Sequence, residues 1–71
     1  MTGNEFLQAL RKTARRNGVP VCVDTRHGKG SHVVVHYGAN KTTLKDRRKE
    51  LPRPLLKKML RDLGLAENDL R

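Results

Sequence analysis

The chain has 71 residues with 16 Lys or Arg against 7 Asp or Glu, which leaves a formal net charge of +9 at pH 7. A chain of this length forms one domain, residues 1–71, and buries only about 60% of the surface that its unfolded form exposes. We therefore expect a thin core and a functional site on an open surface rather than in a deep pocket. No apolar leader and no run of about 20 apolar residues occurs, which predicts a soluble, cytoplasmic protein without membrane contact.

The positive charge indicates a polyanionic partner. Such an excess attracts nucleic acid over long range, and the attraction weakens with salt because fewer condensed counterions are then released. The alternative is that the lysines only keep a small protein soluble, although mixed charges and a smaller imbalance serve solubility as well.

The single cysteine, Cys22, and the three histidines limit the chemistry that is available. One cysteine cannot form an internal disulfide, which favours a reducing compartment, and the scattered histidines do not complete a four-ligand zinc site of the usual spacing. We therefore predict no metal site and no cofactor.

The first predicted element is a helix over about residues 3–17. Thr2 and Glu5 have the spacing of a capping box, apolar residues then recur at helical intervals, and Gly18 is a typical stop. The polar face of this helix is basic and carries Arg11, Lys12, Arg15 and Arg16. Cations near the last turn are favoured by the negative end of the helix dipole, which can explain this cluster without any binding function.

Three short strands follow. The segments are VPVCVD (19–24), SHVVVHY (31–37) and KTTLK (41–45), with turn-forming residues between them. Strands joined by such short turns form an antiparallel meander.

The last predicted element is a helix within LPRPLLKKMLRDLGL (51–65). Pro52 and Pro54 suit its first turn, leucine and methionine form an apolar stripe, and Gly64 is the stop. We predict an α+β fold, a two-layer α-β-β-β-α sandwich in which two helices cover one face of a three-stranded antiparallel sheet. The opposite face is then left uncovered.

The register of the first two strands decides where His32 lies. A three-residue loop, Gly28–Gly30, pairs Val23 with Val35 and gathers the valines on one face, whereas a two-residue loop mixes the faces. The three-residue loop places Arg26 across from His32 on the open face.

A histidine in that position suits RNA cleavage without metal. The imidazole of His32 can take or give a proton near neutral pH, so it can act as general base or acid on a ribose 2′-hydroxyl. Arg26, Lys29 and the backbone amides of the turn that ends at Gly30 can stabilise charge on the phosphoryl oxygens. The alternative is an ordinary surface histidine.

The other two histidines have weaker claims. His36 lies four residues along the strand, about 13 Å from His32, so the two cannot act on one phosphate. We interpret His36 as an RNA or partner contact, or as a tolerated polar residue. The role of His27 stays open.

Two stretches resemble the HicA family of toxins from bacterial type II toxin–antitoxin systems: GKGSHVVV (28–35) and KELPRPLLKKMLRDLGL (49–65). The resemblance implies a single toxin domain with a fold like the double-stranded RNA-binding domain. It implies an mRNA interferase in which His32 is the catalytic residue and the preceding Gly30 and Ser31 of the same motif contact the RNA. It also implies inhibition by a HicB-type antitoxin that covers the active-site face.

Two further functions stay open from the residues alone. One is a non-catalytic basic RNA-binding module of the same fold. The other is an inhibitor or structural protein whose partner is an acidic protein.

Overall fold

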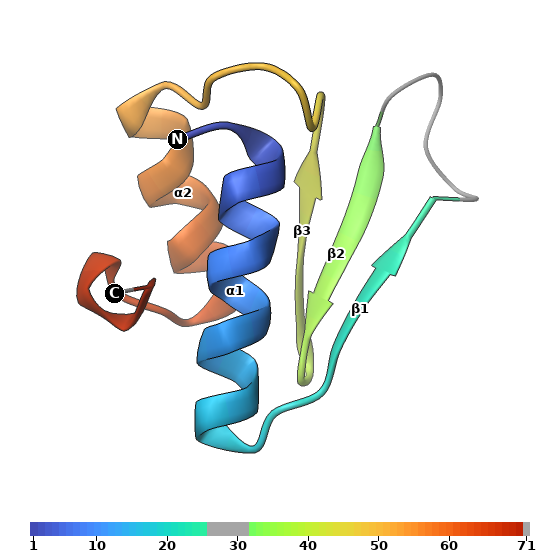
Figure 1. The fold of residues 1–71 in the computed structure, drawn as a ribbon, viewed down its shortest axis with the longest axis vertical. Coiled ribbons are helices and arrows are strands. Elements are labelled where there is room, and N and C mark those ends of the chain that lie inside the picture. Colours follow the sequence, from blue (N-terminus) through green and yellow to red (C-terminus); the bar gives the residue numbers. More distant parts are fainter. Residues whose placement is uncertain (26–31, 71) are drawn as a thin grey trace.

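The computed structural model describes residues 1–25 and 32–70. It has two helices, a three-stranded antiparallel sheet and a short 3-10 helix (Figure 1), which confirms the predicted α+β fold and the order of its elements. The elements are α1 (Gly3–Asn17), β1 (Val21–Asp24), β2 (Val33–Tyr37), β3 (Asn40–Leu44), α2 (Arg53–Leu63) and the 3-10 helix η1 (Glu67–Leu70).

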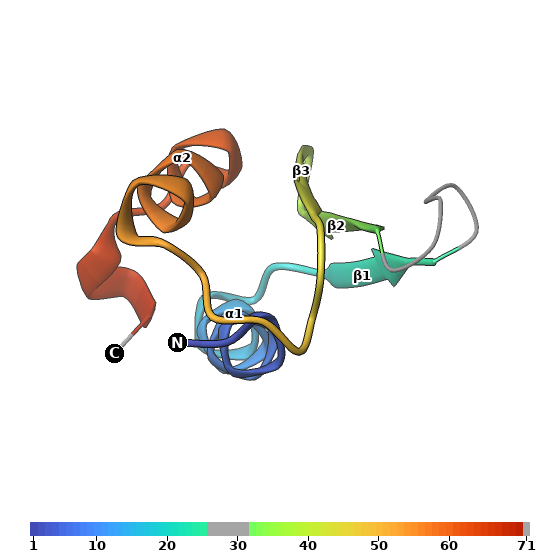
Figure 2. The same ribbon diagram turned by 90° about the horizontal axis from the view of Figure 1, so that it is seen from above.

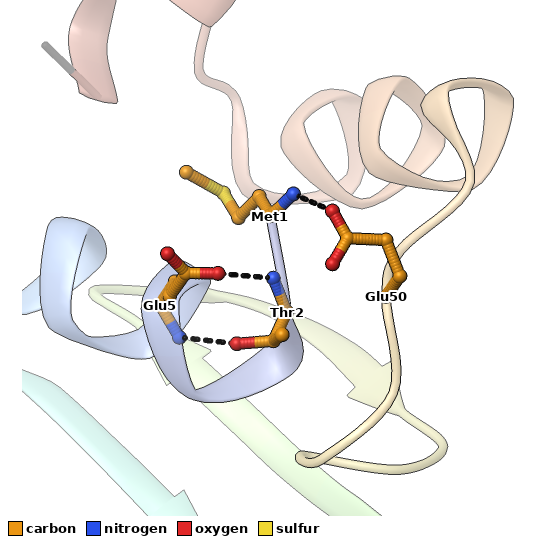
Figure 3. Close-up of polar contacts among 4 residues, drawn as sticks. All are labelled: Met1, Thr2, Glu5 and Glu50. Atoms are coloured by element: carbon orange, nitrogen blue, oxygen red, sulfur yellow. Dashed lines mark hydrogen bonds and ion pairs between the residues drawn. The ribbon is translucent and has the colours of Figure 1, made fainter.

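The predicted bounds of α1 are confirmed by its caps. The hydroxyl of Thr2 accepts a hydrogen bond from the backbone N–H of Glu5 at 3.2 Å, and the Glu5 carboxylate accepts one from the N–H of Thr2 at 2.8 Å (Figure 3). This second bond lowers the pKa of Glu5, because it favours the charged carboxylate. Gly18 ends the helix with φ of 68° in the left-handed region.

The second helix is also bounded as predicted. Pro52 precedes it, Pro54 lies in its first turn, and Gly64 ends it with φ of 74°. Neither helix in the described ranges has the length and apolar character needed to cross a bilayer.

The 3-10 helix η1 was not predicted from the sequence. It is fastened to α1 through the backbone carbonyl of Asp69, which accepts hydrogen bonds from the Thr13 hydroxyl at 2.6 Å and from Arg16 Nη2 at 2.8 Å. The Asp69 carboxylate also accepts the N–H of Ala66 at 2.8 Å, which closes the turn locally.

The sheet has the order β1-β2-β3, and the predicted register is confirmed. Val23 pairs with Val35, as the three-residue loop requires. The second hairpin has only Gly38 and Ala39 between its strands, and Gly38 has φ of 59°. A positive φ at the first central residue alone is the arrangement of a type II′ turn, which suits the twist of a hairpin.

Both helices lie on one side of the sheet, as predicted (Figure 2). Along β2 the side chains alternate between buried and half-buried, so the odd-numbered residues enter the core and Val34 and His36 lie on the other face. The core joins α1, the inner sheet face and α2; its fully buried members include Phe6, Leu10, Val35, Leu44, Met59, Leu60 and Leu63.

The connector between β3 and α2, residues 45–52, crosses the beginning of α1. The N–H groups of Gly3 and Asn4 donate to the carbonyls of Lys49 and Arg47 at 3.2 and 2.8 Å. The crossing is so close that a Cβ at Gly3 would lie 2.7 Å from Arg47 Cα. A glycine at this position therefore lets the connector backbone rest directly on the helix.

Candidate functional site

His32 immediately precedes β2, the central strand of the sheet, and is half-buried. It lines a pocket of about 380 Å³ whose other walls come mainly from the connector between β3 and α2. The remaining lining residues are Lys45, Asp46, Lys49, Glu50, Leu51, Pro52 and Leu55. The sequence predicted a solvated position for His32 on the open face; in the structure the connector forms most of the pocket beside it.

Lys45 directly follows β3, and His32 directly precedes β2. The ladder between the two strands ends with Val33 opposite Leu44, so His32 and Lys45 are the next residues beyond its paired part. Lys45 is exposed and lines the same pocket as His32. Sequence analysis missed this residue, although counting outward from the two-residue turn of the second hairpin would have found it.

Lys49 supplies a second ammonium group to the pocket. The connector that carries Lys49 is held by backbone hydrogen bonds to the start of α1. These bonds fix the position of the Lys49 backbone beside the pocket. Within the described part of the chain, neither Lys45 nor Lys49 forms an ion pair. Both ammonium groups therefore remain available to an anion.

The two carboxylates of the pocket have other partners. Asp46 accepts the backbone N–H of Arg48 at 2.9 Å. Glu50 pairs with the amino group of Met1 (Figure 3), and this hydrogen bond raises the pKa of that amino group. These contacts offset part of the negative charge that the carboxylates bring to the pocket.

His36 does not share the pocket of His32. It lies on the face of β2 that the helices leave uncovered, is half-buried, and pairs in register with Cys22 and Lys41. Among the described residues, His32 is the one imidazole that lines the pocket, in keeping with the prediction that His32 and His36 cannot act on one phosphate.

The other predicted site residues, Arg26, Lys29, Gly30 and Ser31, lie outside the described residues. Their proximity to His32 stays a prediction. What the described residues bring together is an imidazole, two ammonium groups, two carboxylates that have other partners and an apolar wall. The imidazole and the ammonium groups can bind a phosphodiester and exchange a proton with it. Among residues 1–25 and 32–70, no three His, Cys, Asp or Glu side chains are grouped closely enough to hold a metal ion.

Comparison of the chain with models of protein families, with curated proteins and with solved structures finds no match.

Proposed function

We propose that this chain is a HicA-like toxin, an endoribonuclease that cleaves mRNA without metal and uses His32 as general base or acid. The observation that carries the proposal is that His32 and Lys45 line the same pocket at the end of the central strand. The resemblance of residues 28–35 and 49–65 to that family supports it, as does the net charge of +9. The element order and the two helices on one sheet face support the further proposal of a fold like the double-stranded RNA-binding domain.

The proposed reaction uses the RNA's own ribose as nucleophile. The 2′-hydroxyl gives its proton to His32, its oxygen forms a bond to the adjacent phosphorus, and the bond from phosphorus to the 5′-oxygen breaks. The leaving 5′-oxygen takes up a proton from water, and the products are a 2′,3′-cyclic phosphate and a 5′-hydroxyl. Lys45 and Lys49 are suited to hold the phosphoryl oxygens, because ammonium groups beside a partly buried site stabilise developing negative charge more strongly than they would in water.

The test is cleavage of single-stranded RNA in excess EDTA, with a chimeric strand of the same sequence that carries one 2′-deoxyribose at a mapped cleavage position. We expect the RNA to be cut and the deoxyribose position to resist, because it has no nucleophile. Mass spectrometry of the fragments should show cyclic phosphate ends. Binding of RNA without scission would instead support a non-catalytic RNA-binding module, and scission at the deoxyribose position would exclude the proposed chemistry.

We propose further that a HicB-type antitoxin inhibits the chain by covering the pocket of His32. An acidic partner would associate rapidly with a chain of this charge. We expect the C2 proton of His32 to exchange with deuterium from solvent more slowly in the complex than in the free chain. The rate of alkylation of Cys22, which is exposed, reports in the same way whether the antitoxin also covers the sheet face that the helices leave open. Unchanged exchange at His32 in a complex that has lost RNA cleavage would contradict occlusion of the pocket.

A further inference from the structure

A second groove, of about 480 Å³, lies between β3 and α2 and adjoins the pocket of His32. Its walls come mainly from β3 and from the residues of α2 that face this strand. Both hollows are lined by Lys45 and Leu55, so they form one continuous surface. The other residues of the groove are Val34, Lys41, Thr42, Thr43, Lys58, Met59 and Asp62.

The groove has three lysines and one carboxylate. Lys41 and Lys45 are exposed, and neither has an ion-pair partner in the residues that the structure describes. The carboxylate of Asp62 already accepts the hydroxyl of Thr42 at 3.1 Å and lies 3.6 Å from Lys58 Nζ. Because this ion pair is exposed on one helix, it is weak, and Lys58 can exchange it for a phosphate.

The chain offers no exposed phenylalanine, tyrosine or tryptophan ring on which a base could stack. Its only phenylalanine and its only tyrosine, Phe6 and Tyr37, are 0% and 7% exposed. The hydroxyl of Tyr37 is also engaged, because it accepts a hydrogen bond from Asn17 Nδ2 at 3.1 Å. Single-stranded nucleic acids are usually held by base stacking together with contacts to phosphates, so this chain depends on the phosphates.

We infer that the groove between β3 and α2 is the track that holds the backbone of single-stranded RNA and leads it to His32. The inference rests on the proposed ribonuclease function. Lys41, Lys45 and Lys58 contact successive phosphates. The apolar side chains of Val34 and Leu55, which also line the groove, accommodate sugars and bases of any identity. The affinity should then depend steeply on salt and little on base sequence.

The experiment measures binding of a mixed-sequence single-stranded DNA oligonucleotide, which has no 2′-hydroxyl and is not cut by the proposed reaction. Fluorescence anisotropy at several salt concentrations gives the slope of log K against log salt. The groove variant Lys41→Gln/Lys45→Gln/Lys58→Gln is compared with Lys12→Gln/Lys57→Gln/Arg61→Gln, which loses the same charge from other surfaces. At about 0.7 per phosphate contact on a single strand, the groove variant should lower the magnitude of the slope by about 2, and the control should change it much less.

Equal loss in the two variants would overturn the inference, since binding would then follow total charge, and so would retention of the slope by the groove variant. The double variant Lys41→Gln/Lys58→Gln keeps Lys45 and isolates the track from the proposed active site; we expect a decrease of about 1.4. Thermal unfolding is measured for every variant to check that the fold is retained. If the wild type cleaves RNA but the groove variant binds the oligonucleotide as well as the wild type does, the track is refuted and the ribonuclease function is not. If binding depends on the groove but the wild type does not cleave RNA, the ribonuclease function is refuted and the track is not.

Discussion

Replacement of His32 by alanine should lower the rate of RNA cleavage by about 10²- to 10⁴-fold, the range that a positioned general acid or base contributes. The expectation follows from the pocket, whose lining the imidazole shares with Lys45 and where it is the only described group of its kind. The measurement is the single-turnover rate of cleavage at saturating RNA, for the wild type and for the variant side by side.

His36→Ala is the matched control, because it removes the same group from the same strand outside the pocket. At saturating RNA its rate should equal that of the wild type, since any contact of His36 with RNA would affect affinity rather than the chemical step. Similar melting temperatures for both variants would exclude unfolding as the cause of the lost rate. A His32→Ala chain that cleaves as fast as the wild type, or that still inhibits growth when expressed, would remove His32 from the reaction.

The sheet and the helices could be predicted because their signals are local in the sequence. The capping box of Thr2 and Glu5 and the glycines at 18 and 64 fix the helix ends, because each satisfies backbone groups within a few residues. The register of β1 and β2 follows from the requirement that the valines share one face. Short-range hydrogen bonding and a period of two therefore sufficed for the framework.

The surroundings of His32 were harder to predict, because they depend on contacts between distant segments. The run DRRKE, residues 46–50, shows no periodicity and gives no signal that its backbone pairs with the start of α1. Thr2 and Glu50 even form an isolated antiparallel bridge, 48 positions apart along the chain. This pairing carries Lys49 to the pocket that His32 lines.

The pairing also explains why a usually favourable substitution should be harmful at Gly3. Alanine normally stabilises a helix relative to glycine by about 1 kcal/mol, and the backbone of Gly3 does not have positive φ. A Cβ at this position would nevertheless lie 2.7 Å from Arg47 Cα and 2.9 Å from the carbonyl oxygen of Asp46. Both neighbours are backbone atoms, so the connector itself must move, and we expect Gly3→Ala to destabilise the fold by about 1–3 kcal/mol.

The displaced connector should also impair the pocket, because Lys45 and Lys49 belong to the connector and lie on either side of Arg47, where it crosses α1. For a domain of this size, the expected change in stability lowers the melting temperature by about 4–8 °C per kcal/mol. At temperatures where Gly3→Ala remains folded, its cleavage rate should still be below that of the wild type. Asn4→Ala is the control: it raises helix propensity at the next, exposed position and keeps the backbone bond to Arg47, so its stability should be equal or higher. A Gly3→Ala chain as stable and as active as Asn4→Ala would mean that the crossing does not hold the connector in place.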